Sequence, residues 1–233
     1  MNDRTENFYN AKDPGYYAHA RSDIAALIRG QGLKVLDVGC GRGATLAGLK
    51  RSGQAALAVG IEINPEAARE AQARLDRVIV GNIESLELDY PEGHFDLIMM
   101  ADVLEHLVDP WGTLNRLKRY LAPRGMVIVS LPNLREFHTL NRLVFSGDFR
   151  YDQAGIMDRT HLRFFCKKNM LDLFRKGFEI KEIRTVPELK KGEMALFNRL
   201  TLRLFEEFLV IQYIIAAQNT GLSSPAPKGG RDG

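Results

Sequence analysis

The 233-residue sequence has only two cysteines, Cys40 and Cys166. Two thiols exclude the disulfide framework that holds small secreted domains together, and they fit a reducing compartment. The first residues are polar and lack the apolar segment of a secretory signal. The most apolar C-terminal stretch, residues 194–217, is interrupted by charged side chains, which favours a core element. We therefore expect a cytoplasmic protein with no membrane span.

The sequence also lacks a strong excess of one charge, because its formal net charge is only +3. The charge is nevertheless uneven, since residues 134–205 carry 15 Lys and Arg against 9 Asp and Glu, whereas residues 1–133 carry 15 against 17. This excess of positive charge is spread too widely along the sequence to predict nucleic-acid binding. It indicates either a solvated basic face or an attraction for an anionic small-molecule acceptor or partner.

The composition, with 45% hydrophobic and 26% charged residues, is that of one globular domain, and the length is sufficient to bury a core. Uniformly apolar segments alternate with segments of helical spacing bounded by Pro or Gly. Such apolar strands are typical of parallel sheets that helices cover on both faces, so we predict a doubly wound α/β sheet. The expected strands are residues 34–38, 56–63, 77–83, 95–101, 125–131, 178–186 and 208–218.

This alternation stops after the fifth expected strand, where residues 134–166 form a long mixed segment that we interpret as an insertion. We assign residues 1–218 to one domain and the Gly-, Pro- and Ser-rich residues 219–233 to a disordered tail. Helical spacing extends over residues 16–30, 43–53, 64–75, 110–123, 167–177 and 192–208.

A glycine loop, VLDVGCGRGA at residues 35–44, joins an expected strand to an expected helix and fits the pattern G-x-G-x-x-G/A of nucleotide-binding folds. Asp37 precedes the first glycine of the pattern, and its carboxylate would repel the pyrophosphate of NAD or FAD. A carboxylate there instead attracts S-adenosylmethionine, whose aminopropyl group and sulfonium are cationic. Besides Gly39 and Gly41, Gly43 lets the backbone approach a bulky nucleoside.

The carboxyl ends of the next three expected strands carry further candidates. Glu62 ends the second strand and is placed to accept hydrogen bonds from both ribose hydroxyls, although a solvated strand end is the alternative. Asn82 ends the third strand and could read the adenine edge through its amide, while Ile83 packs on the ring. Residues 101–107, ADVLEHL, follow the fourth strand. Because carboxyl ends of adjacent strands meet in one crevice, we expect a single cofactor site.

The segments VLDVGCGRG, GIEIN, GNI, FDLIMMADVLEHLVDP and LKRYLAPRGMVIVSLPN together resemble class I S-adenosylmethionine-dependent methyltransferases over roughly residues 16–218. The resemblance implies a seven-stranded sheet whose last strand runs antiparallel. It departs from the family at Asn82, where relatives often carry Asp, but an amide oxygen can still accept from the adenine amino group. The resemblance implies that Tyr17 and Arg21 close over the methionine end of the cofactor, although their helix could equally pack against the sheet without touching it. The other cofactor contacts that the resemblance implies are Asp37, Gly39, Gly41, Gly43, Glu62, Ile63, Asn82, Ile83, Ala101, Asp102 and His106.

The segment that runs from LPNLREF to DRTHLRFF is similar to small-molecule methyltransferases of bacterial surface-polysaccharide and natural-product pathways. That similarity implies O-methylation of a small hydroxylated acceptor such as a sugar. A looser similarity to a methyltransferase-fold protein of methionine biosynthesis implies the alternative, a non-catalytic module that acts with a partner enzyme.

A hydroxyl acceptor must lose a proton during methyl transfer, which calls for a general base near neutral pH, most often histidine. The candidate is His161 in DRTHLRFF, residues 158–165, where Asp158 could orient the ring and the two arginines could hold an anionic acceptor. Alternatively, Asp158 and Thr160 cap the helix that begins near residue 167, and His161 hydrogen-bonds to a loop carbonyl.

A second group of candidate ligands is Asp102, Glu105 and His106, which stand within five residues. A similar acid-x-x-acid-His run binds a divalent metal in some O-methyltransferases that act on quinone rings or RNA ends, but those runs usually start with Glu. Acidic residues are also common at a helix start, where the helix dipole favours them. We therefore expect no metal ion at this run.

Overall fold

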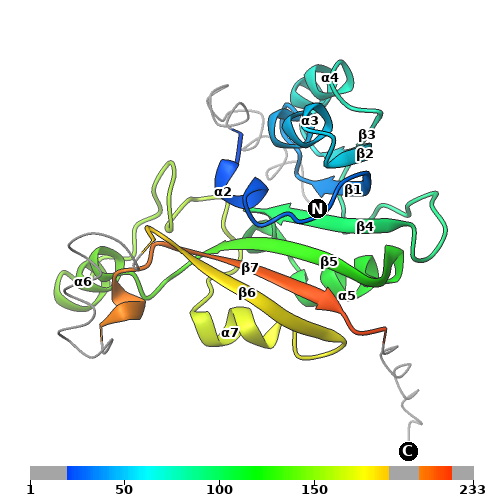
Figure 1. Cartoon of the computed structure of the whole chain (residues 1–233). Helices are drawn as coiled ribbons and strands as arrows, with labels where there is room; N and C mark the ends of the chain where they lie inside the picture. Colours follow the sequence, from blue (N-terminus) through cyan, green and yellow to red (C-terminus); the bar gives the residue numbers. More distant parts are fainter. Residues whose placement is uncertain (1–19, 189–204, 222–233) are drawn as a thin grey trace, which may run out of the picture.

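A seven-stranded sheet forms the centre of the computed structural model, which describes residues 20–188 and 205–221. The strands are β1 (Leu33–Val38), β2 (Ala55–Glu62), β3 (Arg77–Val80), β4 (Phe95–Ala101), β5 (Leu121–Pro132), β6 (Phe178–Val186) and β7 (Gln212–Asn219). Their order is β3-β2-β1-β4-β5-β7-β6, and β7 runs antiparallel to the other six of these strands. The predicted fold class is therefore confirmed (Figure 1).

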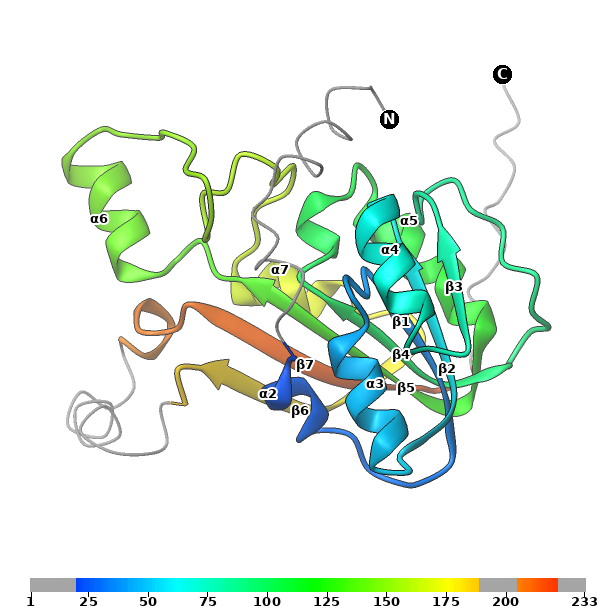
Figure 2. The ribbon, with the colours of Figure 1, turned by 90° about the horizontal axis from the view of Figure 1, so that it is seen from above.

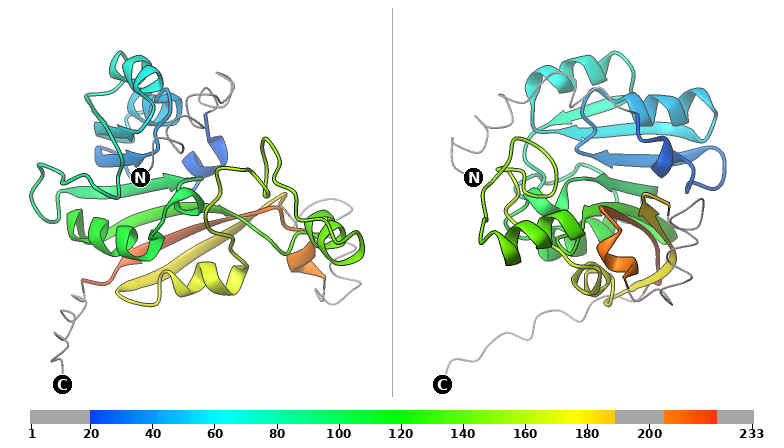
Figure 3. Two further views of the ribbon diagram at one scale, coloured as in Figure 1. Left: turned by 180° about the vertical axis from the view of Figure 1, so that it is seen from behind. Right: turned by 90° about the vertical axis from the view of Figure 1, so that its left-hand side faces the viewer.

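Helices cover both faces of the sheet. The α-helices are α2 (Ser22–Ala25), α3 (Ala44–Arg51), α4 (Pro65–Gln72), α5 (Pro110–Leu117), α6 (Phe137–Phe145) and α7 (Lys167–Asp172), and the 3₁₀ turns are η2 (Leu104–His106), η3 (Lys118–Tyr120) and η4 (Glu206–Phe208). Figure 2 shows α3 and α4 lying across the face formed by β1, β2 and β3. The view from behind shows α5 and α7 against the opposite face (Figure 3). Within the described ranges, no helix has the length and apolar character needed to cross a bilayer.

Two helices begin at sequence signals of the same kind. The side chain of Asn64 accepts hydrogen bonds from two amides in the first turn of α4, and Pro65 occupies the first helical position. Asp109 caps α5 in the same way by accepting from Gly112, and Pro110 follows it. These residues satisfy amides that have no partner inside the helix, so they place both helix starts directly after the strand-end loops.

The core explains why the strands are uniformly apolar. On β1, Val35 packs into the cluster under α2 and α3, whereas Leu36 and Val38 pack into the cluster under α5 and α7. All three side chains are essentially inaccessible to solvent. Because successive side chains of a strand point to opposite faces, the side chains of a strand covered on both faces are mostly apolar.

The insertion after β5 spans residues 133–166 and contains α6, which the sequence pattern did not predict. Its two ends lie side by side, because Asn133 forms a β-bridge with Phe165 and the amide of Leu134 donates to the Phe165 carbonyl at 2.9 Å. Glu136 caps α6, yet no α6 side chain is buried. Figure 1 and Figure 2 both show α6 standing apart from the sheet at the edge where the parallel strands end.

Several strand boundaries differ from the expected ones. β3 ends at Val80 because Gly81, with φ of 151°, turns the chain out of the sheet. β5 begins at Leu121, earlier than expected, and β7 begins at Gln212, later than expected. β7 also includes Asn219, the first residue of the expected tail, whose side chain donates to backbone carbonyls of the β5 segment.

Several expected segments lie partly or wholly outside the described residues. The first expected helix appears only as the short α2, and residues 16–19 fall outside the description. The helix expected over residues 192–208 is described only from residue 205, where η4 forms. Residues 222–233 of the expected tail are likewise outside it.

Candidate active site

A cavity of about 450 Å³ lies at the carboxyl ends of β1, β2, β3 and β4. It is lined by nearly all of the described residues that the sequence predicted as cofactor contacts. These are Arg21, Asp37, Gly39, Gly41, Glu62, Ile63, Asn82, Ile83, Ala101, Asp102 and His106. Tyr17 lies outside the described residues. The structure therefore brings the strand-end positions into one crevice, as the rule for open α/β sheets requires.

The glycine loop forms one wall of the cavity. Gly39 has φ of 72°, and a Cβ there would lie 2.6 Å from the Val103 side chain, so a larger residue does not fit. The amides of Gly39 and Cys40 both donate to the Ile61 carbonyl, which holds the loop against β2. Gly43 serves a different purpose from the one expected: it is the left-handed N-cap of α3 and faces α4 rather than the cavity.

Glu62 is held rigidly in the wall of the cavity with only 4% of its surface exposed. One carboxylate oxygen accepts from the amide of Gly41 at 2.8 Å, and the other accepts from the amide of Asn64 at 2.9 Å. Burial raises the pKa of this carboxyl, although the backbone donors oppose the shift. A carboxylate has about four lone-pair sites, so a ligand hydroxyl can still donate to Glu62 without breaking either bond.

Asp37 is the second buried carboxyl of the cavity. Burial, together with the negative charge of Glu62, raises its pKa to about 7. Two neighbouring carboxyls in a low-dielectric site disfavour each other's charge, and a cation placed between them relieves the cost. The cavity therefore has the chemistry of a site for a ligand that carries both hydroxyl groups and positive charge.

Asp102 and Arg21 close one end of the cavity with an ion pair. The Asp102 carboxylate also accepts hydrogen bonds from Ser130, at 3.0 Å, and from Gln212. Its backbone is left-handed, with φ of 56°, which is uncommon for a residue other than glycine. Burial raises the pKa of Asp102 even though the charge of Arg21 opposes the shift. Asp102 is thus turned toward α2 and β7.

Other lining residues were missed by the sequence analysis. Thr45 lies on α3 and accepts from the backbone amide of Arg21 at 3.0 Å, a contact between residues 24 positions apart that no local pattern indicates. Cys40, Ile61 and Val103 are chain neighbours of predicted contacts and could have been included on that basis. The predicted Asn82 uses its amide oxygen to accept from Glu84 in its own loop.

His161 lies in the insertion, next to the cavity rather than in its lining. Its Nδ1 lies 2.9 Å from the Ile156 carbonyl, which is the loop hydrogen bond expected in the alternative interpretation. Asp158 accepts hydrogen bonds from the amide and hydroxyl of Thr160. The capping part of that interpretation is wrong, because α7 begins after Cys166 with no side-chain cap.

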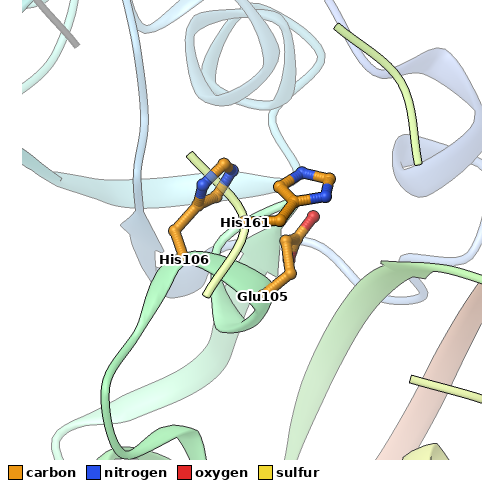
Figure 4. A group of neighbouring side chains, drawn as sticks. All are labelled: Glu105, His106 and His161. Carbon is orange, nitrogen blue, oxygen red and sulfur yellow. The ribbon is translucent and has the colours of Figure 1, made fainter. Parts of the chain in front are cut away.

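The insertion is fastened to the turn after β4, where Glu105 and His106 lie. The backbone amides of Leu162 and Arg163 donate to the Glu105 carbonyl at 2.8 and 2.9 Å. The His106 and His161 rings meet edge to face with centroids 4.8 Å apart. Figure 4 shows the three side chains of Glu105, His106 and His161 together. The structure therefore groups His161 with the last two residues of the DVLEH run, while Asp102 pairs elsewhere.

A family model described as a methyltransferase domain matches residues 9–182. The chain is 33% identical over 111 residues to a ubiquinone biosynthesis O-methyltransferase of Bradyrhizobium diazoefficiens, and the match covers 44% of this chain and 41% of that protein. It is 29% identical over 100 residues to the 27-O-demethylrifamycin SV methyltransferase of Amycolatopsis mediterranei, covering 40% and 36%. The chain thus spans about two fifths of the length of these curated relatives.

Solved structures share the architecture. A SAM-dependent methyltransferase from Thermotoga maritima matches with a TM-score of 0.62 and 20% identity, over 92% of this chain and 97% of that chain. At such low identity the likeness shows the fold alone.

Proposed function

Because the chain belongs to the methyltransferase-domain family, whose model covers residues 9–182, we propose that it transfers a methyl group from S-adenosylmethionine to a small hydroxylated acceptor. A sugar or a natural product is the proposed acceptor class. The observation that carries the proposal is the pair of buried carboxyls, Asp37 and Glu62, beside the glycine loop.

The residues of the cavity fit this cofactor. Glu62 is positioned to accept from both ribose hydroxyls, and Ile83 offers an apolar surface for the adenine ring. Asp37 attracts positive charge, and the paired Asp102 and Arg21 offer one charge of each sign for the amino and carboxylate groups of the methionine end. When bound, S-adenosylmethionine supplies an electrophilic methyl group on a cationic sulfur.

Oxygen is the proposed methyl acceptor. One relative is named an O-methyltransferase and the other a methyltransferase of 27-O-demethylrifamycin SV, and both names specify oxygen. The insertion supplies the acceptor side of the site, because its residue His161 lies against the cavity residue His106. We propose that the acceptor hydroxyl loses its proton next to His161. Asp158 orders this loop by accepting hydrogen bonds from Thr160.

Calorimetry tests the cofactor half of the proposal. The purified chain should bind S-adenosylmethionine and S-adenosylhomocysteine and should not bind NAD. A screen of sugars, phenols and polyketides with a labelled methyl donor then tests the acceptor class. Absence of binding to both adenosyl compounds would contradict the proposal, and binding without transfer to any hydroxylated compound would favour a module that acts with a partner protein.

A further inference from the structure

The buried cluster of Glu105, His106 and His161 joins the turn after β4 to the insertion. We propose that these three side chains bind a divalent cation of the zinc class, which in turn holds the acceptor oxygen beside the cofactor cavity. Cation binding stands on the cluster itself, whereas the role toward the acceptor rests on the proposed methyltransferase function.

The distances within the cluster suit a metal site. Glu105, His106 and His161 are 1%, 5% and 8% exposed, and the donor atoms that they offer lie within 4.8 Å of one another. Ligands about 2.1 Å from a zinc ion with tetrahedral geometry lie about 3.4 Å from one another. The donor atoms therefore have to move closer together by up to about 1.4 Å before all three can bind one cation.

Both histidines are oriented in the manner of metal ligands. The Nδ1 atom of His106 lies 3.1 Å from the Thr160 carbonyl, and Nδ1 of His161 lies 2.9 Å from the Ile156 carbonyl. A carbonyl only accepts, so each Nδ1 carries a hydrogen, and Nε2 is the ring atom that each histidine would offer to a cation. Histidines that bind metals commonly donate their other N–H to a backbone carbonyl, which fixes the ring and strengthens the ligand.

The backbone holds the ligands in place before any cation binds. The carbonyl of Glu105 accepts from the amides of Leu162 and Arg163, the two residues that follow His161. His106 also lines the cofactor cavity, so a cation bound here would lie between that cavity and the insertion. On the basis of the DVLEH run alone we expected no metal. The proposal differs because it includes His161, a third ligand more than fifty positions further along the chain.

The ligand set determines which cation fits. Two imidazoles and one carboxylate suit zinc and neighbouring first-row metals, whereas magnesium and calcium prefer ligand sets made only of oxygen. Three protein ligands also leave a position open for a further oxygen, which is the arrangement of catalytic rather than structural zinc sites.

The open position gives the cation a role in the proposed reaction. A divalent cation lowers the pKa of bound water to about 7, so an acceptor hydroxyl bound here would lose its proton more readily, and that proton would pass to water. The acceptor oxygen would then form the new bond to the methyl carbon as the carbon–sulfur bond breaks, and sulfur would keep the electron pair. In this arrangement His161 contributes as a ligand rather than as the general base expected from the sequence.

The test titrates untagged protein, stripped of metal by EDTA and then dialysed, with Co²⁺ alone and with Zn²⁺ alone. We expect one equivalent of Co²⁺ per chain with visible d–d absorption bands, which one equivalent of Zn²⁺ displaces. His161→Ala and Glu105→Gln should each weaken Co²⁺ binding at least tenfold. His138→Ala is the matched control, because His138 is an exposed histidine on α6 outside the cluster.

Calorimetry with S-adenosylmethionine on the same variants reports whether they are folded. Wild-type protein that binds the adenosyl compound but takes up no Co²⁺ or Zn²⁺ at about 100 μM would overturn the cation site and leave the methyltransferase proposal intact. Equal Co²⁺ affinity in wild type and both folded cluster variants would also overturn it. Protein that binds Co²⁺ but no adenosyl compound would contradict the proposed function and leave the cation site standing.

Discussion

The two sides of the site are built in different ways. The proposed cofactor side consists of short loops at the ends of β1, β2, β3 and β4, and each loop contributes residues close to its own strand. The proposed acceptor side comes from an insertion that returns to the sheet and attaches through backbone hydrogen bonds to Glu105. Local sequence patterns are sufficient to predict a site at strand ends. They do not predict a site that a distant segment completes, because its contacts join residues far apart in the sequence. Variants on the two sides should therefore separate binding of the cofactor from turnover.

The largest effect is expected on the acceptor side, for His161→Ala. Turnover should fall by about 10²–10⁴-fold, the usual size for loss of a group that assists proton removal. Cofactor affinity should change little, because His161 is not part of the cavity lining. Steady-state kinetics and calorimetry on one preparation measure both quantities. Near-normal turnover together with a lower melting temperature would instead assign His161 a structural role.

On the cofactor side, Glu62→Ala should weaken binding of S-adenosylmethionine by about 1.5–3 kcal/mol, the range for hydrogen bonds that involve a charged group. Calorimetry measures this loss directly. Glu66→Ala is the control, because Glu66 is an exposed acid in the first turn of α4 and lies outside the cavity lining. Equal affinity of the two variants would remove the ribose-binding role from Glu62.

The pH dependence of binding sharpens the comparison on the cofactor side. The ionised form of Asp37 attracts a cationic ligand, and its pKa in the ligand-free chain is about 7. Affinity for S-adenosylmethionine should therefore rise about tenfold between pH 6 and pH 8. Asp37→Asn, which cannot ionise, should bind weakly and without this dependence. A flat affinity profile for the wild type would contradict the role of Asp37.

The Asp37 carboxyl also makes the stability of the ligand-free chain depend on pH. Its pKa of about 7 in the folded chain lies above the ordinary value of 3.8, so the folded chain retains the proton between these pH values. The contribution of Asp37 to stability is thus present below about pH 4 and is lost as the pH rises through 7. Urea denaturation at pH 8 should show Asp37→Asn to be more stable than wild type by about 1–3 kcal/mol. An unchanged midpoint would indicate that the pKa of Asp37 in the ligand-free chain is close to its ordinary value.

The smallest effect is expected for Asp158→Ala. This variant removes the hydrogen bonds that the carboxylate accepts from the amide and hydroxyl of Thr160, and their loss should cost about 0.5–1.5 kcal/mol of stability. Thermal unfolding measures that loss, and calorimetry should find normal cofactor affinity. A variant with weakened cofactor binding would show that the two sides of the site are more strongly coupled than the backbone contacts indicate.

Most of the cofactor side could be predicted from sequence because its signals are local. Asp37, Glu62 and Asn82 each stand at the end of an apolar segment, and carboxyl ends of parallel strands meet at one edge of the sheet. Thr45 was missed because its contact with Arg21 depends on how two helices pack. Gly43 lies in the predicted motif, yet its left-handed conformation serves the start of α3 and the approach of α4.

The sequence by itself determined the sheet, its glycine loop and the charge of its strand ends, because periodicity and turn chemistry act over a few residues. Only the tertiary structure decided which acids and histidines meet. Asp102 and Glu105 stand three positions apart in one run, yet Asp102 turns toward Arg21 while Glu105 lies with His161. Asp102 has a left-handed backbone, so the chain changes direction between these two acids. The partner of Glu105 is brought to it by the return of a long insertion, and the path of that insertion depends on contacts far apart in the chain.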